Sequence, residues 1–113
     1  MPKVLNIKNN NGMTSSINNR YDPLEQIIFE QGLRIVGVHC YANLDLILIV
    51  LNNKRVLQRK ISTSTLLSKA TPEQLQNLQL ISGGIGIHWP DVDEDISLKG
   101  LLKEEFSFGA MAA

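Results

Sequence analysis

The sequence predicts a small α+β domain, an antiparallel β-meander of three to four strands packed with two to four short helices. Apolar residues make up 43% of the 113-residue chain and charged residues 19%, as in a folded domain. This length suits a single hydrophobic core. The apolar spacing changes from a helical period to strand-like alternation. We expect one domain over residues 21–105, after a flexible asparagine-rich leader at 1–20 with a short strand at 3–7, and before a tail at 106–113.

A first helix is predicted at about residues 23–31. Asp22 suits the N-cap, Pro23 suits the first helical position, and Glu25 completes a capping box. Gly32 follows at a position where helices commonly end.

Two runs rich in Ile, Val and Leu, at residues 33–41 and 44–51, predict a β-hairpin. In the second run both alternating sets of side chains are apolar, which predicts a central strand covered on both faces. A symmetric homodimer that covers one of these faces is also considered. Asn52 and Asn53 favour a tight turn before a third strand at residues 55–61, which has a more exposed face.

The second half of the chain predicts further short elements. Helices are expected at residues 65–70 and at about 72–78, the second of them capped by Thr71. Glycines bracket a last strand around residues 85–87, and a final helix is expected around residues 98–102.

Charge and cysteine content argue against several classes of function. The 11 basic and 11 acidic side chains give a formal net charge of zero, so no overall field attracts DNA or an anionic membrane. The single cysteine, Cys40, cannot form an intramolecular disulfide, and the N-terminal region lacks the apolar stretch of a secretory signal. The longest apolar run, residues 44–51, is less than half of the about 20 residues that span a bilayer. We expect a cytoplasmic protein without a membrane span.

The most distinctive stretch is GGIGIHWPDVDED at residues 83–95. Its glycines lack the spacing of a dinucleotide fingerprint and the Lys-Ser/Thr pair of a P-loop. An EF-hand loop beginning at Asp91 would need a glycine and a glutamate where Ile96 and Leu102 stand. His88 has no second His or Cys nearby. We therefore predict no metal site, no cofactor and no catalytic residues.

The same stretch predicts a contact surface for a protein partner. Tryptophan is enriched among binding hot spots, although Trp89 could instead plug the end of the sheet. The carboxylates could face a partner or lie on a solvated loop that favours the start of the last helix. The candidate partner-binding residues are His88, Trp89, Asp91, Asp93, Glu94 and Asp95.

Two alternative functions stay open. A nucleic-acid-binding regulator would use the basic side chains around the third strand, which could instead solvate a sheet edge. A metal-dependent enzyme would use His88 with the acidic run at 91–95. Cys40 and its neighbour His39 point to opposite faces of a strand and cannot pair as nucleophile and base. The candidate nucleic-acid-binding residues are Lys54, Arg55, Arg59 and Lys60.

At GIGIHWPDVDEDISLKGLLKEE the sequence resembles a bacterial family called domain of unknown function 2442. Its members often end in a Gly-x-Gly-[IL]-His-Trp-x-x-[LV]-Asp-Glu-Asp-[IL]-Ser stretch before a leucine-rich segment. The segments YDPLEQIIFEQGLRI, LDLILIVLNNKRVLQRKIS and ATPEQLQNLQLI are also similar, so the resemblance covers about residues 21–105. The matching motif positions are Gly84, Gly86, His88, Trp89, Asp93, Glu94, Asp95 and Ser97.

The resemblance implies a compact domain with a β-meander and short helices. It also implies a gene often found beside that of another small protein, domain of unknown function 4160, in a toxin-antitoxin-like arrangement. It implies no catalytic residues. We therefore expect a non-catalytic, antitoxin-like protein-interaction module whose partner is a small protein encoded nearby.

Overall fold

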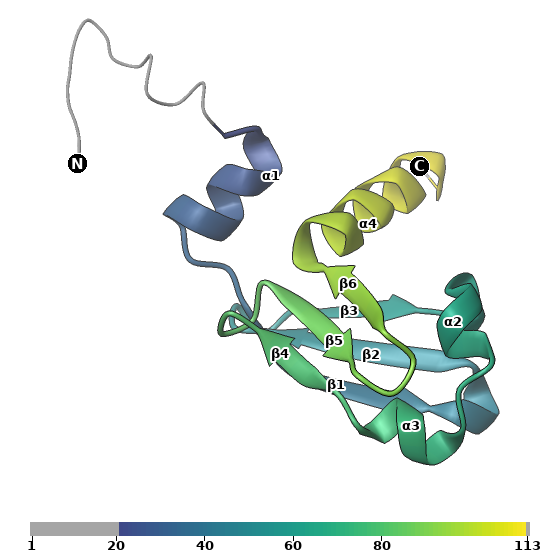
Figure 1. Ribbon diagram of the computed structural model, residues 1–113. Helices are drawn as coiled ribbons and strands as arrows, with labels where there is room; N and C mark the ends of the chain where they lie inside the picture. The colour runs from purple at the N-terminus through teal and green to yellow at the C-terminus, as the bar shows by residue number, and fades with distance from the viewer. Residues whose placement is uncertain (1–20, 113) are drawn as a thin grey trace, which may run out of the picture.

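The computed structural model describes residues 21–112, with side chains through residue 107 (Figure 1). The leader predicted at 1–20 lies outside the described residues. The predicted α+β class is confirmed, but the described chain forms two three-stranded antiparallel sheets rather than one meander of three to four strands. In Figure 1 the second sheet, β4–β5–β6, lies in front of the first, β1–β2–β3.

The elements of the first half of the described chain build the first sheet. They are α1 (Pro23–Glu25), a π-helical turn (Gln26–Glu30), β1 (Ile35–Tyr41), a 3₁₀ turn (Ala42–Leu44), β2 (Leu46–Leu51), β3 (Val56–Arg59) and a second 3₁₀ turn (Ile61–Thr63).

The elements of the second half build the second sheet and the C-terminal helix. They are α2 (Thr65–Ser68), α3 (Pro72–Gln76), β4 (Gln79–Ile81), β5 (Gly86–Trp89), β6 (Glu94–Ser97) and α4 (Leu98–Ala112). Because α4 continues to residue 112, most of the predicted tail belongs to this helix.

The first helix begins with the predicted capping box. The side chain of Asp22 accepts a hydrogen bond from the Glu25 amide at 2.8 Å, and the Glu25 carboxylate accepts from the Asp22 amide at 3.1 Å. Lys99 of α4 donates to both carboxylates, at 2.7 Å to Asp22 and 3.1 Å to Glu25. The hydrogen bond from Lys99 lowers the pKa of Asp22 and raises the pKa of Lys99. Lys99 therefore attaches the start of the described chain to α4.

In the first sheet β2 is the central strand, as predicted, with β1 and β3 antiparallel on either side. Among residues 21–107 only one face of β2 is covered, contrary to the expectation for both faces. Ile47, Ile49 and Leu51 are buried, whereas the side chains between them are only half-buried. The buried face packs against the second sheet and the helices, since its residues share one core with residues of β5, β6 and α4.

The second sheet contains two strands that the sequence did not predict, β4 and β6. β6 has the sequence Glu94-Asp95-Ile96-Ser97, in which only Ile96 is apolar, and its pairing with β5 compensates for its weak strand propensity. Gly84 links the two sheets: its carbonyl accepts from the Ile35 amide at 2.8 Å. Its φ is +121°, and a Cβ there would lie 2.3 Å from the Ile35 carbonyl oxygen, so only glycine fits.

Candidate functional site

Trp89 lies in the hydrophobic core. Its side chain is 0% exposed, and the indole Nε1–H donates to the Leu75 carbonyl at the end of α3 at 3.0 Å. The hypothesis that Trp89 is an exposed anchor for a partner is therefore wrong. Trp89 and Ile87 are two residues apart, so both side chains lie on the inner face of β5, which explains the burial of Trp89.

The predicted acidic run divides between the two faces of the second sheet. Glu94 lies opposite Trp89 on the inner face, and its half-buried carboxylate accepts a hydrogen bond from the Ser64 hydroxyl. Asp95 lies opposite His88 on the outer face, where its carboxylate is 2.5 Å from the His88 Nδ1. The six predicted residues therefore do not form one continuous surface, because β-strand alternation separates them.

The loop between β5 and β6 carries the remaining two carboxylates. Asp91 accepts a hydrogen bond from the Asn77 side chain at 3.0 Å. Asp93 is exposed and adopts a φ of 54°, a left-handed conformation that aspartate tolerates in turns. Both side chains are accessible to a partner, as are Asp95 and in part His88.

The His88–Asp95 pair is open to solvent, with 31% and 65% of the side chains exposed. Acid-base catalysis needs a substrate held beside the catalytic pair. The cavity between β3 and α4 is lined by neither His88 nor Asp95, so it does not place a substrate beside them. In the described part of the chain, no three His, Cys, Asp or Glu side chains form a group that could hold a metal ion.

The predicted basic residues are spread along β3. Lys54 and Arg55 lie in the β2–β3 turn, whereas Lys60 follows the other end of the strand, roughly 17 Å away at strand rise. Arg59 faces α4 and pairs with Glu104 at 3.3 Å, with 15% of its side chain exposed. Within residues 21–107, none of the four forms an ion pair with the carboxylates at 91–95. The structure thus does not bring the four together as one phosphate-binding patch.

Cys40 and His39 point to opposite faces of β1, as predicted. Cys40 is buried, and this burial raises the pKa of its thiol, whereas His39 is exposed. A buried thiol with a raised pKa holds little of the reactive thiolate.

The structure shows which apolar face of β2, considered from the sequence only as a homodimer contact, lies on the outside: the outer face of the first sheet. Cross-strand pairing places Leu48 opposite His39 and Gln58, and Val50 opposite Gly37 and Val56. None of the half-buried β2 side chains on this face packs against the core. We call the following set the open face: Gly37, His39, Tyr41, Leu46, Leu48, Val50, Val56 and Gln58.

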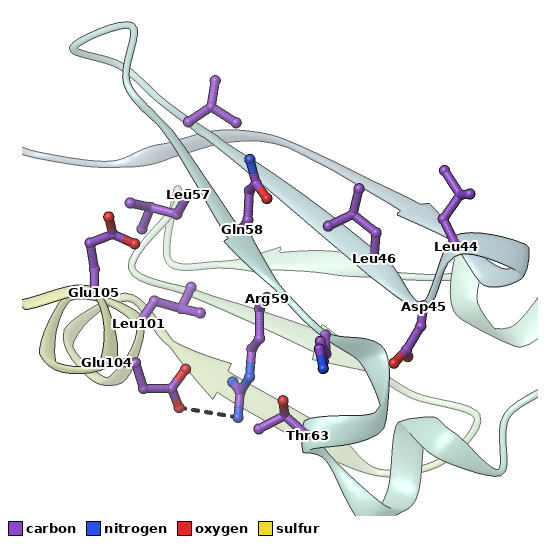
Figure 2. A pocket seen from close by; sticks show the side chains of 12 residues that line it. Leu44, Asp45, Leu46, Leu57, Gln58, Arg59, Thr63, Leu101, Glu104 and Glu105 are labelled. Atoms are coloured by element: carbon purple, nitrogen blue, oxygen red, sulfur yellow. Dashed lines mark ion pairs between the residues drawn. The ribbon is translucent and has the colours of Figure 1, made fainter. Parts of the chain in front are cut away.

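A second unpredicted feature is a cavity of about 730 Å³ along the outer edge of β3. Figure 2 shows Leu101, Glu104 and Glu105 of α4 on one side of this strand, with Arg59 reaching toward Glu104, and Leu46 and Gln58 projecting on the other side. We call this cavity the β3–α4 groove. The sequence of β3 alone does not predict this groove, because residues of α4, far along the chain, form its opposite wall.

The described residues therefore define a two-sheet α+β domain with an uncovered apolar sheet face. No helix formed by residues 21–112 has the length and apolar character that a membrane span requires. The chain belongs to the family described as "Protein of unknown function (DUF2442)", whose model matches residues 35–107. The resemblance expected from the sequence is thus confirmed.

Two solved structures are similar to this chain. A protein of unknown function from Rhodospirillum rubrum is 24% identical, with a TM-score of 0.57 over 64% of this chain and 87% of that one. An uncharacterised protein from Chromobacterium violaceum is 27% identical, with a TM-score of 0.59 over 78% of this chain and 77% of that one. No curated protein matches the chain. The two structures support the fold, whereas the family assignment rests on the family model.

Proposed function

We propose that this chain is a non-catalytic protein-interaction module, antitoxin-like, that binds a small protein encoded nearby through the open face. The observation that carries the proposal is the apolar character of this uncovered sheet face. Antiparallel sheets commonly leave one face in water, but that face then alternates to polar side chains. Here the solvent face of the central strand is Leu46, Leu48 and Val50.

The charge distribution of the open face supports the same proposal. None of its strand positions carries Asp, Glu, Lys or Arg, although such residues make up 19% of the chain. Val56 and Tyr41 at its margins are 51% and 41% exposed. Exposed apolar patches depleted of charge are typical of the centre of a protein interface.

The size of the open face limits the kind of complex. The width of three strands and the six-residue length of β2 give a flat area of roughly 14 by 20 Å at the usual strand spacing and rise. A stable interface buries about 800 Å² on each partner. The open face is therefore the apolar centre of a larger contact, and the partner must also reach the polar residues around it.

The proposal is tested by co-expressing the chain with the product of the adjacent gene and measuring the complex by size-exclusion chromatography with light scattering. Leu48→Asp should abolish co-elution, since an unpaired carboxylate at the centre of an apolar contact costs on the order of 3 kcal/mol or more, a loss of over 100-fold in affinity. Separate elution of the two wild-type proteins would contradict the proposal.

The matched control is Leu66→Asp. Leu66 is an exposed leucine, 46% accessible, on α2 outside the open face. It introduces the same charge into the same chain, so the complex should form normally. Thermal melting of both variants alone separates a loss of binding from a loss of folding. A wild-type chain that elutes alone as a dimer, which Leu48→Asp makes monomeric, would identify the homodimer as the occupant instead.

A further inference from the structure

We propose that the β3–α4 groove is a strand-addition site that binds an extended, apolar and basic segment of a partner polypeptide. The groove shares Leu46, Val56 and Gln58 with the margin of the open face, but the strand-addition site uses the outward backbone of the edge strand β3 instead of a side-chain surface. Three features of the groove support strand addition: the outward backbone groups of β3, an unpaired donor of Arg59 and the acidic side chains of α4.

The backbone of β3 offers unpaired hydrogen-bonding groups along the groove. β3 is an edge strand of the first sheet. The Leu51 amide donates to the Arg55 carbonyl at 2.9 Å, so Arg55 and, by alternation, Leu57 and Arg59 turn their backbone groups toward β2. The N–H and C=O of Val56 and Gln58 therefore point outward, and none of them bonds to a residue that the structure describes outside the sheet.

The groove also contains a donor without a partner. The Arg59 guanidinium pairs with Glu104 through Nη2, but its buried Nε has no hydrogen-bond partner among the described residues. An unpaired buried donor costs free energy, which an acceptor from a bound segment recovers. Because Nε is buried in the free chain, an amide side chain of the bound segment would reach it only after the Arg59 side chain turns outward.

The side chains around the groove favour an apolar segment with a basic residue, because its lining holds three acidic side chains, Asp45, Glu104 and Glu105, against two basic ones, Arg59 and Lys60. Leu57 and Leu101 are buried apolar residues that line the groove. Glu104 is paired with Arg59, whereas Glu105 is exposed and has no ion-pair partner within the described residues. A lysine or arginine of the bound segment would pair with Glu105. The volume of about 730 Å³ falls within the roughly 300 to 1,000 Å³ of ligand-binding cavities.

The test uses the full chain, labelled with ¹⁵N, and a blocked eight-residue peptide in which valine alternates with lysine and threonine. Titration should shift the amide signals of Val56, Leu57 and Gln58, and hydrogen exchange of the Val56 and Gln58 amides should slow. The matched control is the same peptide with N-methylated amides on its β3-facing edge, which cannot form the ladder. Equal binding by the methylated peptide, or no shifts at β3 at millimolar concentrations, overturns the proposal.

Two variants test the residues of the chain. Gln58→Pro removes an outward N–H without breaking a bond to β2, so peptide affinity should fall at least about fivefold while the thermal midpoint changes little. Glu105→Lys should weaken binding of the lysine-containing peptide about threefold and strengthen binding of the same peptide with glutamate in place of lysine. This comparison remains informative if Gln58→Pro fails to fold. Unchanged affinities in Glu105→Lys would contradict the assigned charge preference. Val56 and Gln58 amides that are already protected in the free chain would show that the chain itself, or a second copy, occupies the edge, and would also overturn the proposal.

Discussion

Replacing Trp89 by phenylalanine tests the packing of the core against the alternative that this residue binds a partner. The change removes the hydrogen bond from the indole to the Leu75 carbonyl, which contributes about 1 kcal/mol. The smaller ring leaves a cavity in a site that is 0% exposed, which costs about 1 kcal/mol more. Trp89→Phe should thus lower the free energy of unfolding by about 2 kcal/mol. For a domain of this size the thermal midpoint should fall by about 8 to 16 °C.

Urea denaturation followed by far-ultraviolet circular dichroism measures this loss without relying on the tryptophan fluorescence that the variant lacks. Phe106→Ala is the control, because Phe106 is 56% exposed on α4 and its truncation should cost less than about 0.5 kcal/mol. In the wild type, acrylamide should quench the Trp89 fluorescence poorly. A Trp89→Phe variant as stable as the wild type, with a readily quenched wild-type fluorescence, would refute the burial argument.

Three further predictions concern the backbone, a cap and an ion pair. Gly84→Ala should lower the free energy of unfolding by more than about 3 kcal/mol in urea denaturation, because its Cβ would meet the Ile35 carbonyl. Gly83→Ala, whose Cβ would meet open space, should lower it by only about 1 kcal/mol, and equal losses in the two variants would contradict this. Ser64→Ala should lower the thermal stability by about 1 to 2 kcal/mol, since its hydroxyl caps α2 and bonds to Glu94, and calorimetry showing no loss would exclude this role. The pKa of Asp22 lies below its ordinary value of 3.8 in the folded chain, so the stability from its carboxylate is present above pH 3.8 and is lost as the pH falls through the lowered pKa. The urea midpoints of wild type and Asp22→Asn, which keeps a capping side chain, should therefore differ at neutral pH and converge in acid, and a constant difference would contradict the effect of Lys99.

The sequence predicted elements whose local signals are strong. The capping box at Asp22 and Glu25 formed as expected, and so did the hairpin of β1 and β2. β6 was missed because three of its four side chains are polar, and its strand conformation depends on pairing with β5. Propensity within a short segment cannot report a partner strand that lies elsewhere in the chain.

The candidate site was predicted less well for a related reason. The run at 83–95 is distinctive in the sequence, but the sequence does not show that alternation turns Trp89 and Glu94 inward and leaves His88 and Asp95 outward. The sequence of β2 is apolar on both faces, yet only the fold shows which face the second sheet covers. The β3–α4 groove joins residues more than 40 positions apart, as Arg59 and Glu104 illustrate.

The measurement that tests the proposed function most directly is chemical-shift mapping of the ¹⁵N-labelled chain against the unlabelled product of the adjacent gene. The open face predicts the largest shifts at β1 and β2, centred on His39, Leu48 and Val50, and their loss in Leu48→Asp but not in Leu66→Asp. Shifts confined to the hairpin from His88 to Asp95, with β1 and β2 unchanged, would contradict the open face as the binding surface.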